Sequence, residues 1–305
     1  MVYAISAYLL WGVLPLYFLL LIPTGPFEIV AWRVLLSLVF CALLLTAIRA
    51  WPAFLALVRD RRVLLTMGLA GALIYVNWQT YVYAATSGQV VEASLGYFIN
   101  PIVTVFLGVL VLRERLTVAQ WTAVGISILA VLVLAIGQGF PWIALTLAFS
   151  FGFYGLIKKR VGPRVDAVSG LTLETAWLAP VAGVQLWAVA AFGGGITLGQ
   201  NGAWHTAMLL LAGAVTAVPL LLFASASRRL PLTVLGFIQY FAPFIQFLVG
   251  VLVLGEAMSL QRWIGFGLVW IALVVLTADL VRRARGAKRA AVVEPPAVTA
   301  GCEPV

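Results

Sequence analysis

The chain has 305 residues, of which 64% are hydrophobic and 10% are charged, and its mean hydropathy is +1.10. Such a composition is far from that of soluble globular proteins and indicates a protein embedded in a lipid bilayer. The formal net charge is +9, but the basic residues are spread over the connections between apolar segments and form no recognition domain. We therefore expect no nucleic-acid partner.

Ten continuous apolar segments divide the chain. A helix needs about 20 apolar residues to cross the hydrocarbon core, and suitable segments lie near residues 2–21, 28–48, 63–85, 91–112, 119–137, 140–157, 169–192, 204–226, 231–254 and 261–281. Because the runs are continuous rather than alternating, we do not expect a transmembrane β-barrel. The sequence predicts an all-α integral membrane protein of about ten transmembrane helices. The connection 51–62 is either a short helix in the membrane interface or an ordinary loop.

Positive charges predict the orientation of these helices. If both termini are cytoplasmic, the inner connections hold 17 of the 19 Lys and Arg residues: Arg49, Arg59, Arg61, Arg62, Arg113, Arg115, Lys158, Lys159, Arg160, Arg164, Arg228, Arg229, Arg282, Arg283, Arg285, Lys288 and Arg289. Basic residues beside membrane segments mark the cytoplasmic side, so we expect both termini there. The first segment is expected to remain as a helix rather than be cleaved, since no basic region precedes it. Residues 282–305 are predicted to form a basic, disordered tail.

Residues 101–134 and 243–276 are two copies of one segment. At an offset of 142, twelve of the 34 aligned positions are identical. The matched pairs include Pro101 and Pro243, Gly108 and Gly250, Glu114 and Glu256, and Trp121 and Trp263. Arginines flank the first glutamate but not the second, which indicates that the second copy lies upside down in the membrane. We therefore predict two inverted five-helix repeats, 1–137 and 138–281, the arrangement of many secondary transporters. The repeat motif itself is interpreted as structural, with proline kinks and glycine helix contacts.

Two charged residues fall inside predicted spans. Arg33 lies about five residues into the second segment, and Glu174 lies within the seventh. The repeat offset carries Arg33 to Thr175, next to Glu174. Charges in hydrocarbon are expensive and mark functional sites, so we expect the two side chains to line opposite sides of a cavity or to pair in one conformational state. A permanent structural ion pair is the alternative, and the Arg33 side chain could also extend to the membrane surface.

Aromatic and amide side chains complete the predicted site. The cavity candidates besides Arg33 and Glu174 are Asn77, Trp78, Tyr81, Tyr97, Asn100, Tyr154, Trp177, Gln239 and Tyr240. Such a mixture suits an organic solute that is partly apolar. Glu92 and His205 are interpreted as boundary residues, with Glu92 solvated. The sequence contains no phosphate-binding loop, no metal-spaced Cys/His cluster and no hydrolase motif, so we expect no cofactor, no metal and no enzymatic activity.

Four strings resemble the RarD branch of the EamA proteins, in the drug/metabolite transporter superfamily. They are 92–101 (EASLGYFINP), 148–155 (AFSFGFYG), 235–240 (LGFIQY) and 7–12 (AYLLWG), and the resemblance extends to about residue 281. It implies ten helices in two inverted repeats around a central cavity, the inner membrane of a bacterium, and the export or exchange of a solute.

The predicted function is secondary transport of small organic metabolites or drugs by alternating access. Arg33 would attract an anionic group, and Glu174 would bind an amine or a coupling proton, a pairing that suits zwitterions. Two alternatives remain open at this point. In the first, the chain is a non-transporting membrane subunit or partner protein, and in the second it is an enzyme embedded in the membrane.

Overall fold

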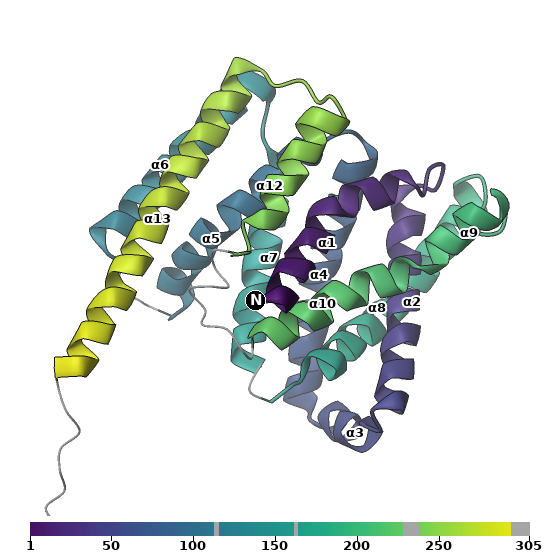
Figure 1. The fold of residues 1–305 in the computed structure, drawn as a ribbon. Coiled ribbons are helices and arrows are strands. Elements are labelled where there is room, and N and C mark those ends of the chain that lie inside the picture. Colours follow the sequence, from purple (N-terminus) through teal and green to yellow (C-terminus); the bar gives the residue numbers. More distant parts are fainter. Residues whose placement is uncertain (113–115, 162–163, 228–237, 294–305) are drawn as a thin grey trace, which may run out of the picture.

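The computed structural model describes residues 1–112, 116–161, 164–227 and 238–293, and every regular element in these ranges is a helix (Figure 1). In chain order the elements are α1 (Val2–Leu19), α2 (Pro26–Ala47), α3 (Trp51–Arg59), α4 (Arg61–Thr86), α5 (Val90–Leu112), α6 (Val118–Gln138), α7 (Trp142–Val161), α8 (Ala167–Phe192), α9 (Gly202–Leu210), α10 (Ala212–Ser227), α12 (Phe241–Leu248), the π-helical turn η1 (Val249–Val253) and α13 (Leu260–Val293).

The prediction of an all-helical membrane protein is confirmed. Within the described ranges, eight helical stretches are long and apolar enough to cross a bilayer, and two shorter apolar helices lie at Trp142–Lys158 and Phe241–Val253. Many large apolar side chains face outward, for example Leu43 and Ile136, as expected of helices that face lipid rather than water. Ten membrane-spanning helices remain a prediction.

Polar caps determine where several helices begin. Asp60 accepts hydrogen bonds from the first backbone N–H groups of α4, and Asp166 does the same for α8. Thr117 and Gln120 form a reciprocal capping box at the start of α6. Each cap satisfies N–H groups that no carbonyl of the same helix can reach. The connection 51–62 contains the helix α3, so the alternative of an ordinary loop is wrong.

The last helix is longer than predicted. Helix α13 continues to Val293, so residues 282–293 of the predicted tail are helical, and residues 294–305 lie outside the described ranges. Residues 282–293 are rich in Ala, Arg and Lys, which favour helix, and this explains the extension. Arg283 and Asp279 form an i, i+4 ion pair of 3.1 Å at the same end of the helix.

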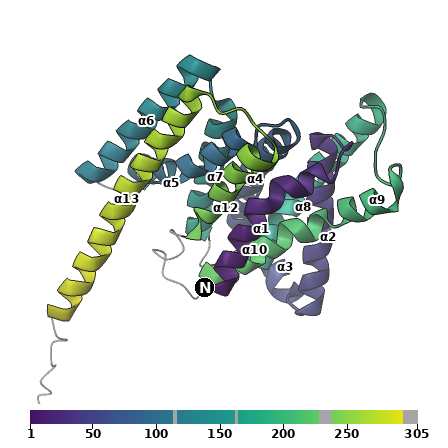
Figure 2. The same cartoon turned by 45° about the horizontal axis from the view of Figure 1, so that its top comes forward.

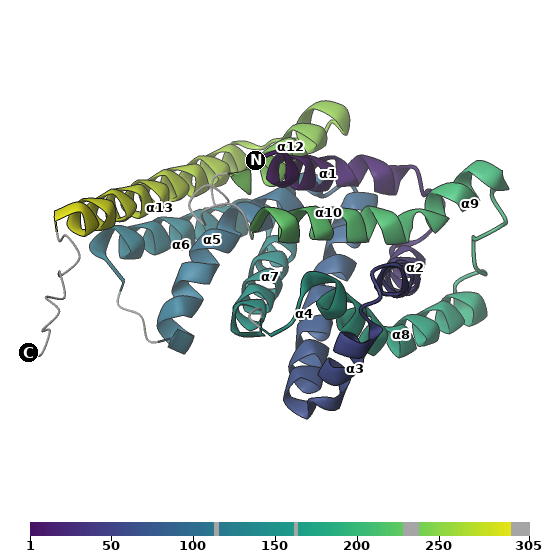
Figure 3. The same ribbon diagram turned by 60° about the horizontal axis from the view of Figure 1, so that its bottom comes forward.

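The helices pack around two main apolar clusters. The larger cluster lies among α1, α2, α4 and α8, and the second lies among α5, α6, α12 and α13. Helices α6 and α13 lie side by side at one end of the molecule, and α9 lies at the opposite end (Figures 1, 2 and 3). Helix α2 packs against α8 and α10, α1 packs against α10 and α12, and α7 packs against α4 and α5.

Small residues allow the closest of these approaches. A Cβ atom on Gly12 of α1 would lie 2.8 Å from Cβ of Ile245 in α12, and one on Gly96 of α5 would lie 2.6 Å from the carbonyl oxygen of Ala144 in α7. Distances under 3 Å leave no room for a side chain, so both glycines fix helix pairs.

The predicted repeat motif has a mixed outcome. A Cβ atom on Gly250 would lie 2.7 Å from the Val91 side chain, as expected of a helix-packing glycine. Pro101 lies inside α5 and Pro243 is buried in α12. Trp121 and Trp263 are both largely exposed. Glu114 lies outside the described residues, as do the side-chain surroundings of Gly108.

Candidate functional site

Arg33 is the most unusual side chain in the interior. It lies in the second turn of α2, is only 4% exposed, and its Nε donates to Oγ1 of Thr216 in α10 over 2.9 Å. Its guanidinium carbon lies 5.2 Å from the ring centre of Phe18 and 4.9 Å from that of Trp78. These cation–π contacts hold the guanidinium inside the protein. The alternative in which Arg33 extends to the membrane surface is therefore wrong.

Arg33 has no counterion in the part of the chain that the structure describes. The ion pairs within those ranges are Lys158–Glu174 and Arg283–Asp279. The remaining described carboxylates accept hydrogen bonds from backbone N–H groups elsewhere: Glu28, Asp60, Glu92, Asp166 and Glu256. A buried charge without a partner is costly, and the two aromatic faces offset only part of that cost.

Three buried polar atoms, on Arg33, on the nearby Tyr81 and on its neighbour Gln246, lack a hydrogen-bond partner among the described residues. They are Nη1 of Arg33, the hydroxyl of Tyr81 and Oε1 of Gln246. The Tyr81 ring lies 6.0 Å from the Phe18 ring that also contacts Arg33, and its hydroxyl neighbours Gln246 without completing a hydrogen bond. Buried polar atoms are almost always satisfied, so three in one place require an explanation.

We call Phe18, Arg33, Trp78, Tyr81, Thr216 and Gln246 the Arg33 cluster. Its members come from α1, α2, α4, α10 and α12, and all six are buried. The Nε2 atom of Gln246 donates to the backbone carbonyl of Trp11, which ties α12 to α1. The cluster therefore contains residues from both predicted five-helix repeats.

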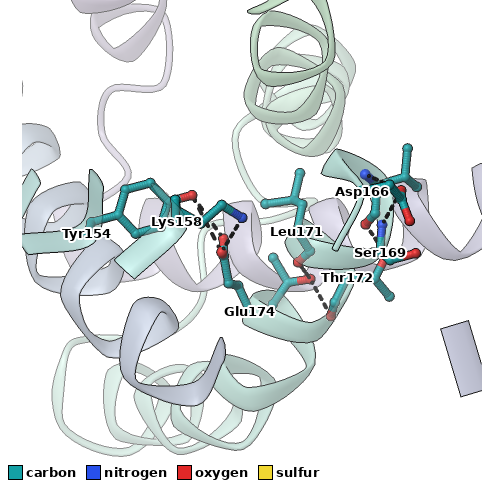
Figure 4. A network of polar contacts seen from close by, with 9 residues as sticks. Tyr154, Lys158, Asp166, Ser169, Leu171, Thr172 and Glu174 are labelled. Carbon is teal, nitrogen blue, oxygen red and sulfur yellow. Dashed lines mark hydrogen bonds and ion pairs between the residues drawn. The ribbon is translucent and has the colours of Figure 1, made fainter. Parts of the chain in front are cut away.

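Glu174 has a different partner from the one predicted. It is 1% exposed in α8, and its carboxylate receives a 2.8 Å hydrogen bond from Nζ of Lys158 and a 3.2 Å hydrogen bond from the hydroxyl of Tyr154 (Figure 4). The predicted pairing of Arg33 with Glu174 is not seen in this structure. The reason is that α7 continues one turn past Tyr154 and brings Lys158, interpreted from the sequence as a loop residue, over Glu174.

The predicted amides connect helices. Nδ2 of Asn77 donates to the Leu147 carbonyl (3.2 Å) and to Oγ of Ser150 (3.1 Å), and its Oδ1 accepts from the hydroxyl of Tyr97 (3.0 Å). Asn100 donates to the carbonyl of Ala148. These bonds join α4 and α5 to α7. Both polar atoms of the Asn77 amide and the Nδ2 donor of Asn100 are thus engaged within the protein, so we interpret these residues as support for the site.

Three predicted cavity residues lie away from the Arg33 cluster. Trp177 is 42% exposed and its indole N–H donates to the carbonyl of Leu64 across the α4–α8 contact. Tyr240 packs against the second apolar cluster, and Gln239 precedes it in a turn at the start of the described segment. The structure does not bring these three side chains together with Arg33.

Of the two boundary residues, His205 is buried and Glu92 is half-buried. His205 is 5% exposed, and its Nε2 lies 2.8 Å from Oγ1 of Thr24 and 3.1 Å from the carbonyl of Leu21. Glu92, predicted to be solvated, accepts a hydrogen bond from the backbone N–H of Ile143 at the start of α7. Both satisfy polar groups at helix ends.

Glu256 connects the second repeat motif to the first half of the chain. Its two carboxylate oxygens accept from the backbone N–H groups of Val90 (2.6 Å) and Val91 (3.0 Å) at the start of α5. Burial raises the pKa of Glu256, and the nearby Glu92 adds to this, while the two N–H groups and Arg262 oppose it. The glutamate retained in the repeat therefore serves as a helix cap between the two halves.

Sequence comparison assigns the family. The model of the EamA-like transporter family matches the chain twice, at residues 1–136 and 140–278. The chain belongs to this family. A RarD protein of Streptomyces exfoliatus is 49% identical over 287 residues, covering 93% of this chain and 90% of the relative. An uncharacterized transporter of Bacillus subtilis, YojE, is 40% identical over 292 residues, covering 94% and 96%.

The comparisons identify a RarD-type EamA protein, and therefore a multi-pass bacterial membrane protein of a transporter family rather than an enzyme. One solved crystal structure aligns with a TM-score of 0.58 over 93% of this chain and 97% of that chain, at 20% identity. At this identity the likeness extends to the fold alone. Within the described ranges, no group of three His, Cys, Asp or Glu side chains is placed to hold a metal ion.

Sequence reasoning missed part of the site of this EamA protein. Phe18 and Thr216 resemble ordinary residues of apolar helices in the sequence, and Gln246 was not among the predicted cavity residues. Their role depends on α1, α10 and α12 meeting at Arg33. The available signal was Arg33 itself, since a charge in a predicted span requires polar or aromatic neighbours.

Proposed function

We propose that this EamA protein is a secondary transporter that moves a small organic solute across the membrane by alternating access, with the Arg33 cluster as its binding site. The observation that carries the proposal is the buried guanidinium of Arg33, which has no counterion in the described ranges and contacts residues of both halves of the chain. An unpaired charge inside a membrane protein is costly to keep. A solute that supplies the missing partner accounts for its presence.

The pattern of helix contacts supports two related halves. Under the 142-residue offset, α1, α2, α4, α5 and α6 correspond to α7, α8, α9–α10, α12 and α13. Exchanging the two halves converts the contacts of α1 with α10 and α12 into contacts of α7 with α4 and α5, and both sets are present. The same exchange leaves the pairs α2–α8, α5–α12 and α6–α13 unchanged, and these contacts are present as well. A two-fold relation between the halves predicts this correspondence. In inverted repeats the solute binds where the halves meet.

The distribution of charges supports cytoplasmic termini in a bacterial plasma membrane. Helix α3, the start of α8 and the end of α13, beside which many of the basic residues lie, are on the lower side of Figure 1, whereas the α1–α2 and α12–α13 connections are on its upper side. The lower side is therefore the proposed cytoplasmic face.

The test combines metabolite profiling with reconstitution. Untargeted comparison of cells that lack or overproduce the protein identifies the solute, and purified protein in proteoliposomes should then move that solute. Arg33→Gln should abolish the flux, while Arg59→Gln, which removes an exposed charge on α3, should leave it unchanged. Flux that depends on pH and membrane potential indicates proton coupling, and indifference to both indicates facilitated diffusion or exchange. If wild-type protein moves no solute, a non-transporting membrane subunit is the better description.

A further inference from the structure

We infer that the Arg33 cluster selects organic monoanions, a carboxylate on a flat apolar skeleton, over zwitterions and cations. This inference rests on the proposed function and specifies its substrate class. It replaces the expectation from sequence that the interior carries one positive and one negative group for a zwitterion.

The buried charges do not balance at Arg33. Arg33 provides one positive charge with no carboxylate beside it in the described ranges. Glu174, the carboxylate that would receive an ammonium group, is already paired with Lys158 at 2.8 Å and bonded to Tyr154. The site therefore has a net positive charge, and a ligand with a single negative charge neutralises it.

The surroundings of the Arg33 guanidinium leave one of its hydrogen-bond donors without a partner among the described residues. Phe18 and Trp78 lie near the guanidinium carbon, at 5.2 Å and 4.9 Å from their ring centres, and Nε is bonded to Thr216. The Nη1 donor is left without a partner. Guanidinium N–H groups match carboxylate oxygens in strength and direction. A carboxylate at Nη1 would complete the hydrogen bonds of Arg33.

The side chains near Arg33 provide both hydrogen-bonding groups and aromatic rings. The Tyr81 hydroxyl and Oε1 of Gln246 are neighbours without a completed hydrogen bond, so a ligand with a second acceptor or a hydroxyl group can bind to one of them. The rings of Phe18, Tyr81 and Tyr97 follow one another at 6.0 Å and 5.6 Å between centres. Such a row of ring faces and edges favours a flat apolar skeleton.

An ammonium group would find no comparable partner. Within the described ranges, no carboxylate near Arg33 is free to accept its hydrogen bonds, and Arg33 itself repels it. Removing an ammonium group from water is strongly unfavourable when no charged partner replaces the water. A zwitterion therefore gains from its carboxylate and loses from its amine.

The test uses four probes that share one skeleton and differ in charge: 3-phenylpropionate, phenylalanine, phenethylamine and 3-phenylpropanamide. Binding to purified full-length protein is measured by calorimetry or by the shift in melting temperature. We expect 3-phenylpropionate to bind at least about tenfold more tightly than the other three, the factor of a charge-assisted hydrogen bond. Equal or tighter binding of phenylalanine, phenethylamine or the amide overturns the inference.

Variants locate the effect at Arg33. Arg33→Gln should remove the preference for the anion, and Arg33→Lys should restore part of it, because lysine keeps the charge but not the planar donors. Arg59→Gln should bind the four probes as the wild type does. Tyr81→Phe removes only a hydroxyl and should also weaken binding of the anion. It provides a second test of the site if Arg33→Gln fails to fold. An anion preference that survives both Arg33→Gln and Tyr81→Phe places binding elsewhere and overturns the inference.

The two proposals fail in different ways. If the protein transports a solute identified by metabolite profiling but shows no preference for monoanions, only the substrate class is wrong. If it binds 3-phenylpropionate through Arg33 but moves no solute in proteoliposomes, the transport proposal is wrong and the site is that of a binding protein.

Discussion

Arg33 and Glu174 are both buried in the helix bundle, but their charges are compensated to different degrees. Glu174 receives hydrogen bonds from Lys158 and Tyr154, so its charge is compensated within the protein. Arg33 contacts two aromatic rings and one hydroxyl, so its charge is not. A buried charge that has a partner within the protein contributes to the stability of the fold, whereas a buried charge without one can bind a ligand. This difference between two residues separates the structural site from the proposed binding site.

A mutation of the compensated pair checks its structural role. Lys158→Met should destabilise the protein by about 3 kcal/mol, because it leaves the buried Glu174 without its partner. The double variant Lys158→Met/Glu174→Gln should recover most of that loss, since no unpaired charge remains. The measurement is the free energy of unfolding in mixed micelles. Arg283→Met breaks the more exposed pair with Asp279 and serves as the control, with a loss of at most about 1 kcal/mol.

The opposite outcome would assign Glu174 to transport. If both variants fold as well as the wild type but lose flux in proteoliposomes, the pair takes part in coupling or in solute binding rather than in stability.

At the scale of one element, α8 shows how a connection sets the position of a buried charge. Asp166 accepts hydrogen bonds from the backbone N–H groups of Val168 and Ser169 and so determines where α8 starts, two turns before Glu174 (Figure 4). Burial alone would raise the pKa of Asp166, but the hydrogen bonds from Ser169 and Val168 outweigh it, so this pKa lies below its ordinary value.

Replacing this cap gives a prediction with a pH dependence. Asp166→Ala should lower the free energy of unfolding by about 1 kcal/mol at neutral pH. Because the folded pKa is depressed, the ionised carboxylate stabilises the fold above the unfolded pKa, and this contribution disappears as the pH falls through the folded value. Asp166→Asn keeps a capping side chain without a titrating group, so it should retain most of the stability and lose the part of the pH dependence that comes from Asp166. Melting temperatures of the three proteins between pH 3 and pH 7 provide the measurement, and an identical pH dependence for wild type and Asp166→Asn would refute it.

The sequence predicted individual elements better than their partners. Hydropathy placed most of the helices within a few residues, because a membrane span has a fixed minimum length. The segment predicted at 204–226 is divided into α9 and α10, and the start of the segment predicted at 231–254 lies outside the described residues. It could not show that Lys158 reaches Glu174 or that Trp177 lies between α4 and α8, since both depend on how helices far apart in the chain are rotated against each other. The extension of α13 to Val293 was missed for another reason, because polar, alanine-rich sequence carries no hydropathy signal.

At the scale of the whole molecule, the proposed site combines residues from the two predicted halves. Thr216 and Gln246 come from the second half, and Phe18, Arg33, Trp78 and Tyr81 come from the first. The sequence repeat predicted two related halves, and the charge at position 33 indicated where to search. The other members of the cluster could not be predicted, because their positions follow from contacts between α1, α2, α10 and α12.

Transport through the Arg33 cluster requires that the cluster opens to both sides of the membrane in turn. The most direct measurement is thiol labelling of Tyr81→Cys in a background of Cys41→Ala and Cys302→Ser, with a membrane-impermeant reagent applied from either side of oriented vesicles. Alternating access predicts labelling from both sides, with 3-phenylpropionate slowing both reactions. Labelling from one side only, or from neither, would contradict a transporter with its binding site at Arg33.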